Sequence, residues 1–270
     1  MFDQISLDSR RPTGLSQFIG NAQVLNRLVP QIQKGRIPRL ALFHGPSGAG
    51  KTTLALILAR LFFCTTARQA QWRDTNPCGS CAPCLASPDG IAECHIYTGA
   101  QLAENPQQYS QHLRRLLWQN WNLVLVDEAQ DLTERLQALM QTDLEQAKAV
   151  VLFTTTHPNK LSQILVNRFT NHVYELRRPS QEEAVQGMAD LCTRIKVHAT
   201  PTQLSRVARH YGCDLRKCME FPHTVVEQTT DGMLTDAFCD MVLGSEVGEE
   251  SMATVSSPSS PLTTRQPKCI

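Results

Sequence analysis

The chain has 270 residues, of which 41% are hydrophobic and 19% are charged, and its formal net charge is +1. This composition predicts an ordinary globular protein with one large or two modest domains. No apolar run reaches the roughly 18 residues of a membrane span, and the N-terminus lacks signal-peptide features, so we expect a cytoplasmic protein with no membrane contact. The small net charge argues against a wholly basic nucleic-acid-binding surface, so any DNA contact needs a local patch.

The first part of the chain predicts a loop and then an amphipathic helix over residues 22–33, in which Val24, Leu25, Leu28 and Val29 recur at helical spacing. A short apolar run over residues 40–43 follows. It breaks into a glycine-rich loop and then into a second helix, which is apolar on all sides and is therefore expected to be buried against a sheet.

This loop fits the phosphate-binding pattern G-x-x-x-x-G-K-[ST], with Gly45, Gly50, Lys51 and Thr52 at its fixed positions. Glycines let successive backbone N–H groups point at a polyphosphate, and the following helix adds its N-terminal donors. We expect Lys51 to reach the β and γ phosphates of a nucleotide and the Thr52 hydroxyl to hold Mg²⁺. The alternative is a glycine turn with a chance lysine. The residues predicted to bind the nucleotide here are Gly45, Pro46, Ser47, Gly48, Ala49, Gly50, Lys51, Thr52 and Thr53.

Four of the ten cysteines lie at metal-ligand spacing. Cys64, Cys78, Cys81 and Cys84 follow the pattern C-x13-C-x2-C-x2-C, with small or turn-forming residues between the last three. Thiolates at this spacing converge on one tetrahedral zinc ion, which suits a reducing compartment better than disulfides do. We expect a structural zinc module over about residues 64–94, with loose thiols as the alternative and Cys94 as a spare cysteine.

A second group with catalytic chemistry follows a predicted strand over residues 93–97 and a predicted helix over 107–119. The apolar run 123–126 ends in Asp127 and Glu128, and a buried parallel strand delivers carboxylates to the carboxyl edge of its sheet in this way. We expect Asp127 to complete the Mg²⁺ shell and Glu128 to act as general base or to orient the attacking water. Taken alone, the pattern also fits a strand with a solvated end.

Another buried strand is expected over residues 149–153, and Thr156 follows it closely. Its hydroxyl would then contact the attacking water or the γ-phosphate, although threonines are also plain strand formers. A short helix over 161–169 and a last strand over 173–176 complete an alternation of strands and helices. This alternation predicts an α/β fold with a parallel sheet.

From residue 179 the pattern changes to helices alone. Ser180 and Glu183 form a capping box at the start of the first helix. Pro201 stands at the first position of the second helix, and Asp214 is expected to cap the third.

Pro222 should kink or stop that third helix, and a helical pattern resumes over residues 234–242. Residues 245–270 are rich in Ser, Thr and Pro and contain no aromatic residue, so we expect a disordered tail. The predicted domains are therefore residues 1–178 for the nucleotide-binding domain and 179–244 for a small helical domain.

In this order the motifs resemble the AAA+ clamp-loader subunits of bacterial DNA polymerase III, most closely the gamma/tau type. The resemblance implies an AAA+ fold: a RecA-like parallel sheet with the phosphate loop and an inserted zinc module, followed by a small all-α lid domain. It spans about residues 8 to 243. The motifs that carry it are Arg11-Pro12, Phe18-Ile19-Gly20, the phosphate loop, the four cysteines, Asp127-Glu128, Thr155-Thr156, Pro158-Asn159-Lys160-Leu161, Arg168 and Gly212-Cys213-Asp214-Leu215-Arg216.

The resemblance also implies a role for each matching residue. Pro12 and Ile19 would line the adenine pocket, Thr156 would be the first sensor, and Arg216 the second sensor, which folds the lid onto the nucleotide. Arg168 would be the arginine finger that reaches the neighbouring subunit's nucleotide, where a guanidinium stabilises charge on the transferred phosphoryl group. An arginine after a short helix is otherwise usually solvated. The catalytic residues expected are thus Lys51, Asp127, Glu128, Thr156, Arg168 and Arg216.

The chain differs from the family pattern in two places within the matched region. Asn167 and Phe169 replace the Ser and Cys that flank the finger, and Ala129-Gln130 stand where the bacterial family usually has Val-His. The family also continues into a helical collar domain that holds the pentamer together, where this chain has its polar tail. We therefore expect assembly through the AAA+ surfaces and other subunits, or a divergent form of the family.

The resemblance implies an ATPase that uses ATP, Mg²⁺ and Zn²⁺ and loads a sliding clamp onto primed DNA. Its partners would be other AAA+ clamp-loader subunits, the sliding clamp and primer-template DNA. One alternative is a non-hydrolysing, delta-prime-like stator subunit, which often loses the phosphate loop. Another is a different DNA-directed AAA+ motor, against which the zinc module argues. A metabolite kinase would share the loop but neither the lid arginine nor the cysteines.

Overall fold

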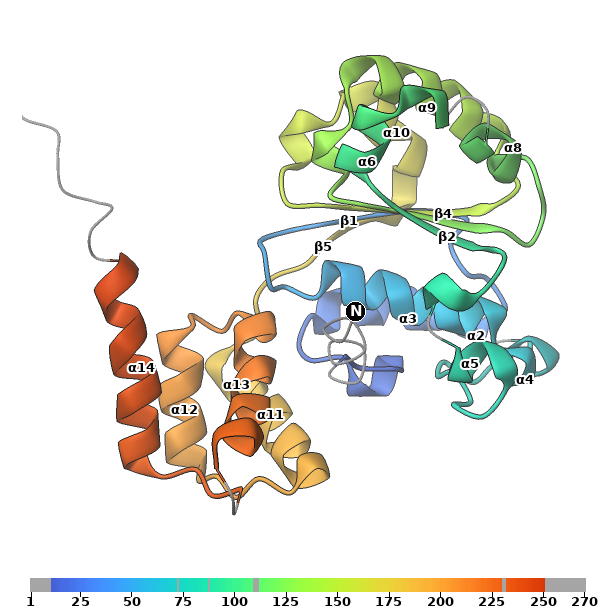
Figure 1. Cartoon of the computed structure of the whole chain (residues 1–270). Coiled ribbons are helices and arrows are strands. Elements are labelled where there is room, and N and C mark those ends of the chain that lie inside the picture. Colours follow the sequence, from blue (N-terminus) through green and yellow to red (C-terminus); the bar gives the residue numbers. More distant parts are fainter. Residues whose placement is uncertain (1–10, 72, 87, 109–111, 230–231, 251–270) are drawn as a thin grey trace, which may run out of the picture.

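The structure is a computed structural model that describes residues 11–71, 73–86, 88–108, 112–229 and 232–250. Its centre is a five-stranded sheet in the order β2-β3-β4-β1-β5 (Figure 1), and every neighbouring pair is parallel. The expected α/β fold with a parallel sheet is therefore confirmed. The strands are β1 (Leu40–His44), β2 (Cys94–Thr98), β3 (Leu123–Asp127), β4 (Val150–Thr155) and β5 (Val173–Glu175).

Helices cover both faces of the sheet (Figure 1), as parallel sheets require because both of their faces are apolar. On one face lie α2 (Ala22–Gln33) and α3 (Lys51–Phe63), whose apolar residues share a core with β1. On the other face lie α8 (Arg114–Leu117), α9 (Glu134–Gln146) and α10 (Gln163–Phe169). The sheet is thereby a rigid platform that fixes where its strand ends meet.

Two differences from the expected elements lie on the second face. Helix α9 has no counterpart among the predicted elements, and the predicted helix over 107–119 is broken. Residues 112–113 form a π turn that leads into α8, and residues 109–111 lie outside the described residues. The short elements are η1 (Leu15–Gln17), α4 (Thr65–Gln69), α5 (Ala82–Leu85), η2 (Pro88–Gly90), α6 (Gly99–Glu104), α7 (Pro106–Gln108), η4 (Ala129–Asp131), η5 (Pro158–Lys160) and η6 (Thr170–His172).

Four C-terminal helices pack around a core of their own that includes Met188, Val207 and Phe221. The expected capping box of Ser180 and Glu183 begins the first of them, and Asp214 caps the third by accepting from two backbone N–H groups. Among the described residues, no helix has the length and apolar content that a membrane crossing requires. These C-terminal helices are α11 (Gln181–Ile195), α12 (Pro201–His210), α13 (Leu215–Gln228) and α14 (Asp236–Glu250).

Pro222 was expected to kink or stop the third helix, and the stop is wrong, because α13 continues through Pro222 to Gln228. A proline removes one helical hydrogen bond, but Pro222 is buried, as are Phe221 and Val225 of the same helix, and tertiary packing of this kind outweighs local propensity. Helix α14 also runs to Glu250, beyond the expected start of the tail at residue 245. The rest of that tail, residues 251–270, lies outside the described residues.

Candidate functional site

The three strands that lead to the predicted nucleotide site are neighbours in the sheet, so their carboxyl ends meet at one edge. β1 ends at His44 and pairs there with Thr155 of β4, and β3 on the far side of β4 ends at Asp127. The backbone N–H of Gly45 donates to the carbonyl of Thr155 at 3.3 Å. This register brings the glycine-rich loop, the two carboxylates and the threonine run to one place.

The loop between β1 and α3 uses backbone conformations that favour glycine. Gly45, Gly48 and Gly50 have φ values of 145°, 74° and 90°, in the region where a side chain is strained. A Cβ on Gly45 would lie 2.1 Å from the carbonyl oxygen of Leu176, and one on Gly50 would lie 2.9 Å from the ring of Phe18. The glycines therefore allow both the curl of the loop and its close packing.

Lys51 begins α3 and folds back over the loop, where its Nζ donates to the carbonyl of Pro46 at 3.0 Å. The residue is only 6% exposed. Burial lowers the pKa of Lys51, while the nearby carboxylates of Glu128 and Asp127 act in the opposite direction. A cation that is largely removed from water and aimed along the loop is well placed to bind an anion.

The two predicted Mg²⁺ ligands are in contact. The Thr52 hydroxyl donates to Oδ1 of Asp127 at 2.9 Å, and the hydroxyl of buried Thr154 donates to the same oxygen. Hydroxyl and carboxylate oxygens are the hard ligands that Mg²⁺ prefers, so these residues fit that ion. Thr154 also accepts from the backbone N–H of Glu128 at 3.3 Å, which ties both carboxylate-bearing residues to β4.

Glu128 has φ 50° and ψ 51°, a left-handed conformation that is unusual for a residue with a side chain and that recurs at functional sites. Its side chain faces the main pocket, together with the basic residues Lys51 and Arg216. The lining of this pocket comprises Arg11, Pro12, Phe18, Ile19, Ser47, Gly48, Gly50, Lys51, Thr52, Thr53, Glu128, Leu215, Arg216, Met219 and Glu220. The predicted adenine-pocket residues Pro12 and Ile19 are thus brought together with the phosphate loop.

Several predicted site residues lie outside that lining. Gly45, Pro46 and Ala49 belong to the loop without facing the pocket, and Asp127 lies behind Thr52. Thr156 is half-buried at the tip of β4, where its hydroxyl reaches Oε2 of Glu128 at 3.4 Å. It therefore contacts the pocket through Glu128.

Arg168 lies on α10, away from the pocket of its own chain. Its guanidinium forms an ion pair with Glu145 of α9, and its side chain is 34% exposed. The Nε atom is buried and has no hydrogen-bond partner among the described residues. The structure thus does not bring Arg168 together with the phosphate loop of the same chain.

Hydrogen bonds join the start of α13 and the segment before α11 to the loop. The backbone N–H of Leu215 donates to the carbonyl of Gly48 at 3.1 Å. Arg178, in the segment between β5 and α11, donates to the carbonyl of Ser47 at 3.3 Å and to that of Gly212 at 3.2 Å. These bonds place Arg216 over the phosphate loop.

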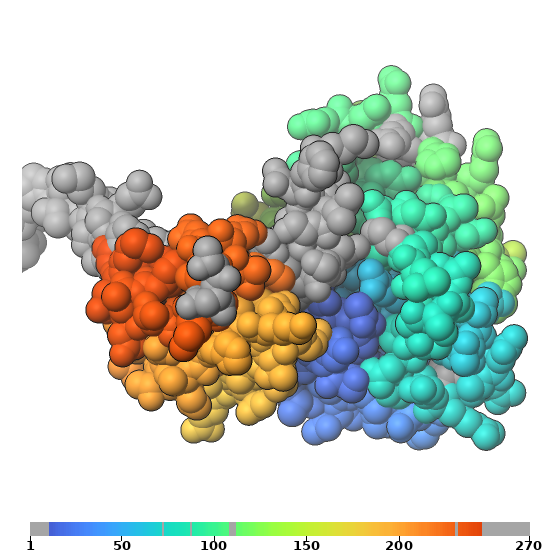
Figure 2. Space-filling model, turned by 60° about the horizontal axis from the view of Figure 1, so that its bottom comes forward, coloured from blue at the N-terminus to red at the C-terminus, as the bar shows by residue number. Residues whose placement is uncertain are grey.

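Some residues of this site were not predicted from the sequence. Phe18 packs under Gly50, and buried Asn21 binds the backbone of Arg177 in both directions, at 2.7 Å and 3.0 Å. Arg178 and Gln130 join segments that are distant along the chain. No local motif marks such residues, because their partners are set by the fold. In Figure 2 the N-terminal segment (blue) lies between the C-terminal helices (orange) and the residues of the cysteine module (cyan to teal).

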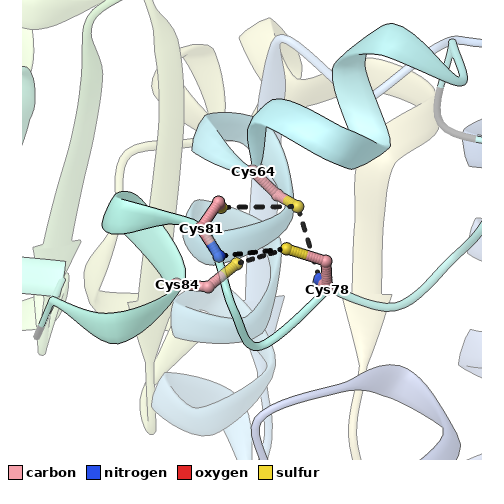
Figure 3. A group of neighbouring side chains, drawn as sticks. All are labelled: Cys64, Cys78, Cys81 and Cys84. Carbon is pink, nitrogen blue, oxygen red and sulfur yellow. Dashed lines mark hydrogen bonds between the residues drawn. The ribbon is translucent and has the colours of Figure 1, made fainter.

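The four predicted metal ligands converge at the end of α3 (Figure 3). The Sγ atoms of Cys64, Cys78, Cys81 and Cys84 all lie within 4.8 Å of one another. Two of these Sγ–Sγ distances are 3.9 Å, for Cys78 and Cys84, and 4.0 Å, for Cys64 and Cys81. Four sulfurs at about 2.3 Å from one zinc ion would be about 3.8 Å apart. The donor set and its spacing therefore fit a tetrahedral metal ion.

The surroundings of these thiols differ from one another. Hydrogen bonds, first that from the Thr66 hydroxyl and then those from Ser80, lower the pKa of Cys78 to about 5. Burial instead raises the pKa of Cys84. Cys94 is outside the group, at the start of β2, where burial raises its pKa to about 12. The separation agrees with the expectation that Cys94 is a spare cysteine.

With this geometry described, the chain can be placed among known proteins. A family described as "DNA polymerase III, delta subunit" matches residues 20–174, more than half of the chain. The chain belongs to this family. The matched range contains the phosphate loop, the four cysteines and both carboxylates.

The curated relatives include DNA polymerase III subunits of the gamma/tau type. The gamma/tau subunit of Mycobacterium bovis is 27% identical over 190 residues, which cover 67% of this chain and 32% of that protein. The tau subunit of Escherichia coli is 24% identical over 257 residues, which cover 91% of this chain and 38% of that protein. The chain thus spans about a third of the length of these two relatives. These findings confirm the expected resemblance to gamma/tau subunits.

Solved structures agree on the fold. The RuvB Holliday junction branch migration motor of Thermotoga maritima superposes with a TM-score of 0.62 at 17% identity, over 87% of this chain and 72% of that chain. The likeness extends over the sheet and the C-terminal helices. The expected AAA+ fold, a parallel sheet followed by a helical region, is thereby confirmed.

Proposed function

We propose that this chain is an ATP-binding and ATP-hydrolysing subunit of a clamp-loader-type assembly that acts in DNA replication. The observation that carries the proposal is one pocket that joins a complete phosphate loop, the Thr52–Asp127 pair, Glu128 and Arg216. Each of these groups has a part to play in phosphoryl transfer, which depends on positioning and charge stabilisation.

The residues of the pocket have different roles in binding and hydrolysing ATP. The backbone N–H groups of the loop and Lys51 hold the phosphates, and Thr52 with Asp127 would hold Mg²⁺. Bound ATP supplies a terminal phosphoryl group that is transferred to water. Glu128 accepts a proton from that water or orients it. Pro12 and Ile19 bind the base.

The C-terminal helices serve as a lid in this proposal. Arg216 faces the phosphates from α13, and the bonds from Leu215 and Arg178 to the loop carbonyls fix the distance between lid and loop. A nucleotide that contacts both sides favours the closed arrangement by its additional contacts there. Thr156 senses the nucleotide through its bond to Glu128.

Arg168 acts on a neighbouring subunit's nucleotide. This is supported by its place outside its own pocket and by a buried Nε that has no partner among the described residues. Glu145 holds the guanidinium on the surface in the single chain. The assembly partners proposed are other AAA+ clamp-loader subunits, a sliding clamp and primer-template DNA.

The cysteine group is proposed to hold one structural Zn²⁺. Four thiolate ligands leave no open coordination position for catalysis. The ion would fix the segment between α3 and β2, where α4 and α5 are too short to build a core.

A second candidate is a subunit that binds nucleotide without hydrolysing it and serves as a rigid part of the assembly. It is supported by the family description, which names a delta subunit for residues 20–174. The intact Lys51, Thr52, Asp127 and Glu128 favour the hydrolysing subunit.

Steady-state ATP hydrolysis distinguishes the two candidates. The purified chain is assayed alone, with primed DNA, and with primed DNA plus sliding clamp, beside Lys51→Ala. The proposal expects hydrolysis that clamp and DNA stimulate and that Lys51→Ala reduces by about 100-fold or more. ATP binding without hydrolysis in all three conditions would favour the second candidate.

A further inference from the structure

Gln130 lies in η4, two residues beyond Glu128, and its side-chain amide joins Glu128 to the tip of β4. The amide oxygen accepts from the Thr155 hydroxyl at 2.6 Å and from the backbone N–H of Thr156 at 3.2 Å. The amide nitrogen donates to Oε2 of Glu128 at 2.6 Å. One half-buried side chain thus bridges two strand ends.

The orientation of this amide follows from its partners. A primary amide presents an acceptor oxygen and a donor nitrogen. The two groups on the β4 side, the Thr155 hydroxyl and the Thr156 N–H, donate, and the Glu128 carboxylate can only accept. The opposite orientation would place a donor against an N–H and an acceptor against a carboxylate, so a single arrangement is stable.

The bond from Gln130 also decides how Glu128 faces the pocket. Oε2 receives both Gln130 Nε2 and the more distant Thr156 hydroxyl. In the part of the chain that the structure describes, the other carboxylate oxygen, Oε1, receives no hydrogen bond. Since Glu128 lines the pocket, Oε1 is the oxygen that is free to bind a water molecule there.

We propose that Gln130 is a positioning residue for Glu128 in ATP hydrolysis. It holds Oε2, directs Oε1 to the attacking water, and connects that carboxylate to Thr155 and Thr156. The inference rests on the proposed hydrolytic function. Fixing a long carboxylate side chain costs conformational entropy, because the side chain loses rotamer freedom. Since Gln130 already holds Glu128 in place before the reaction, this entropy cost does not add to the activation barrier of hydrolysis.

The alternative is that Gln130 has a purely structural role, as a brace that needs only its contacts with Thr155 and Thr156. Gln130 would then matter only because it ties η4 to Thr155 and Thr156. The two roles differ in the N–H donated to Glu128, which positioning requires and a brace does not.

Gln130→Glu separates the two roles. The substitution is nearly isosteric. In its ionised form the new carboxylate still accepts from Thr155 and Thr156, but it has no hydrogen to donate to Glu128 and repels it instead, so turnover is measured at alkaline pH, where the ionised form is favoured. We expect kcat to fall by about 10- to 100-fold while the dissociation constant for ATP changes by less than about twofold. Gln130→Ala should lower kcat to a similar extent. A thermal melt of each variant reports whether the chain is folded.

Gln101→Glu is the matched control. Gln101 lies on the same edge of the sheet, after β2, and uses its oxygen to accept from the N–H of Thr98 at 2.9 Å. Glutamate keeps that bond, as it does in capping boxes generally, so the control adds the same charge at this edge without losing a contact. We expect unchanged kcat.

A second readout tests whether Gln130 acts through Glu128. In a Glu128→Gln background, adding Gln130→Ala should lower kcat by less than about twofold, because residues that act as one unit are not additive. The inference is overturned if Gln130→Glu keeps the wild-type kcat, if it changes only the affinity for ATP, or if the losses in the double variant multiply. If the wild-type chain itself hydrolyses no ATP, the proposed function fails and the inference fails with it.

Discussion

The carboxylate of Asp214 lies directly against the backbone of Gly48, so a Cβ built on Gly48 would come within 2.2 Å of it. Three groups hold the Asp214 side chain in this position. It accepts from the N–H of Arg216 at 3.0 Å and from that of Lys217 at 3.4 Å, and it pairs with Arg178 at 3.4 Å. The tip of the phosphate loop and the start of α13 are thus in direct contact through this carboxylate.

This contact predicts that Gly48→Ala separates the C-terminal helices from the loop. The added methyl group meets a carboxylate that cannot move away, so ATP binding should weaken by about tenfold or more, because Arg216 is displaced from the phosphates. Titration with a fluorescent ATP analogue measures the effect.

Gly79→Ala is the control for backbone strain. Gly79 has φ 71°, close to the 74° of Gly48, but no atom lies within 4 Å of its added Cβ. We expect Gly48→Ala to cost about 1–3 kcal/mol more in the free energy of unfolding than Gly79→Ala does. Equal costs and equal ATP affinities would contradict the contact described here.

The cysteine group predicts one zinc ion per chain and a stability that depends on it. Cys81→Ser should abolish stoichiometric zinc and remove about 2 kcal/mol, which lowers Tm by roughly 4–8 °C. Metal content by atomic emission and a thermal melt, with and without a chelator, provide the test.

Cys94→Ser is the control variant, since Cys94 is a buried cysteine of the same region that lies outside the group. It should keep the zinc content of the wild type and its response to the chelator. Equal zinc loss in both variants would contradict the assignment of ligands.

The hydrogen bonds that Thr154 makes with Asp127 and Glu128 predict that its hydroxyl stabilises the fold. Thr154→Val keeps the shape but leaves Asp127 Oδ1 and the N–H of Glu128 without this partner. The free energy of unfolding should fall by about 1–3 kcal/mol, measured by urea denaturation. Thr193→Val removes the hydroxyl that donates to the Ala189 carbonyl at 3.0 Å on the exposed face of α11, and it should cost less than about 0.5 kcal/mol. Similar losses for both would argue against the role of Thr154.

Arg168 predicts an effect that only the assembled complex shows. Arg168→Ala should lower ATP hydrolysis by roughly 10³-fold in the complex with its partner subunits, while ATP binding by the isolated chain stays the same. Arg114→Ala is the control. It removes the ion pair between Arg114 and Asp143, which lies on α9 as Glu145 does, and it should leave ATP hydrolysis unchanged. A loss of ATP binding in the isolated Arg168→Ala chain would contradict action across an interface.

Local patterns were sufficient to predict the elements that hold the site. The apolar runs before Gly45 and Asp127 became β1 and β3, the two strands that flank β4 in the sheet, and the cysteine spacing led to sulfurs that do converge. Each of these patterns is predictive because it reflects one physical requirement that residues close together in the sequence must meet, such as burial of a strand on both faces or a common distance to a metal ion.

Helix α9 was missed although its start carries a signal. Thr133 caps it, and Leu136, Met140 and Leu144 are buried at intervals of one helical turn. Most of the other residues of the helix are polar, so its apolar stripe is narrow. Contacts such as Gln130 with Thr155 or Asp214 with Gly48 were beyond prediction for another reason: they join segments that only the sheet order and the placement of α13 bring together.

The most direct test of the account compares ATP turnover by the wild-type chain and by Glu128→Gln, with ATP binding measured on the same preparations. Glu128 lines the pocket, but the phosphate contacts that we propose are made by the loop and Lys51. We predict that Glu128→Gln binds ATP as the wild type does and turns it over about 100-fold more slowly. Equal turnover by both proteins, or binding without turnover by the wild type, would contradict the claim that this pocket hydrolyses ATP.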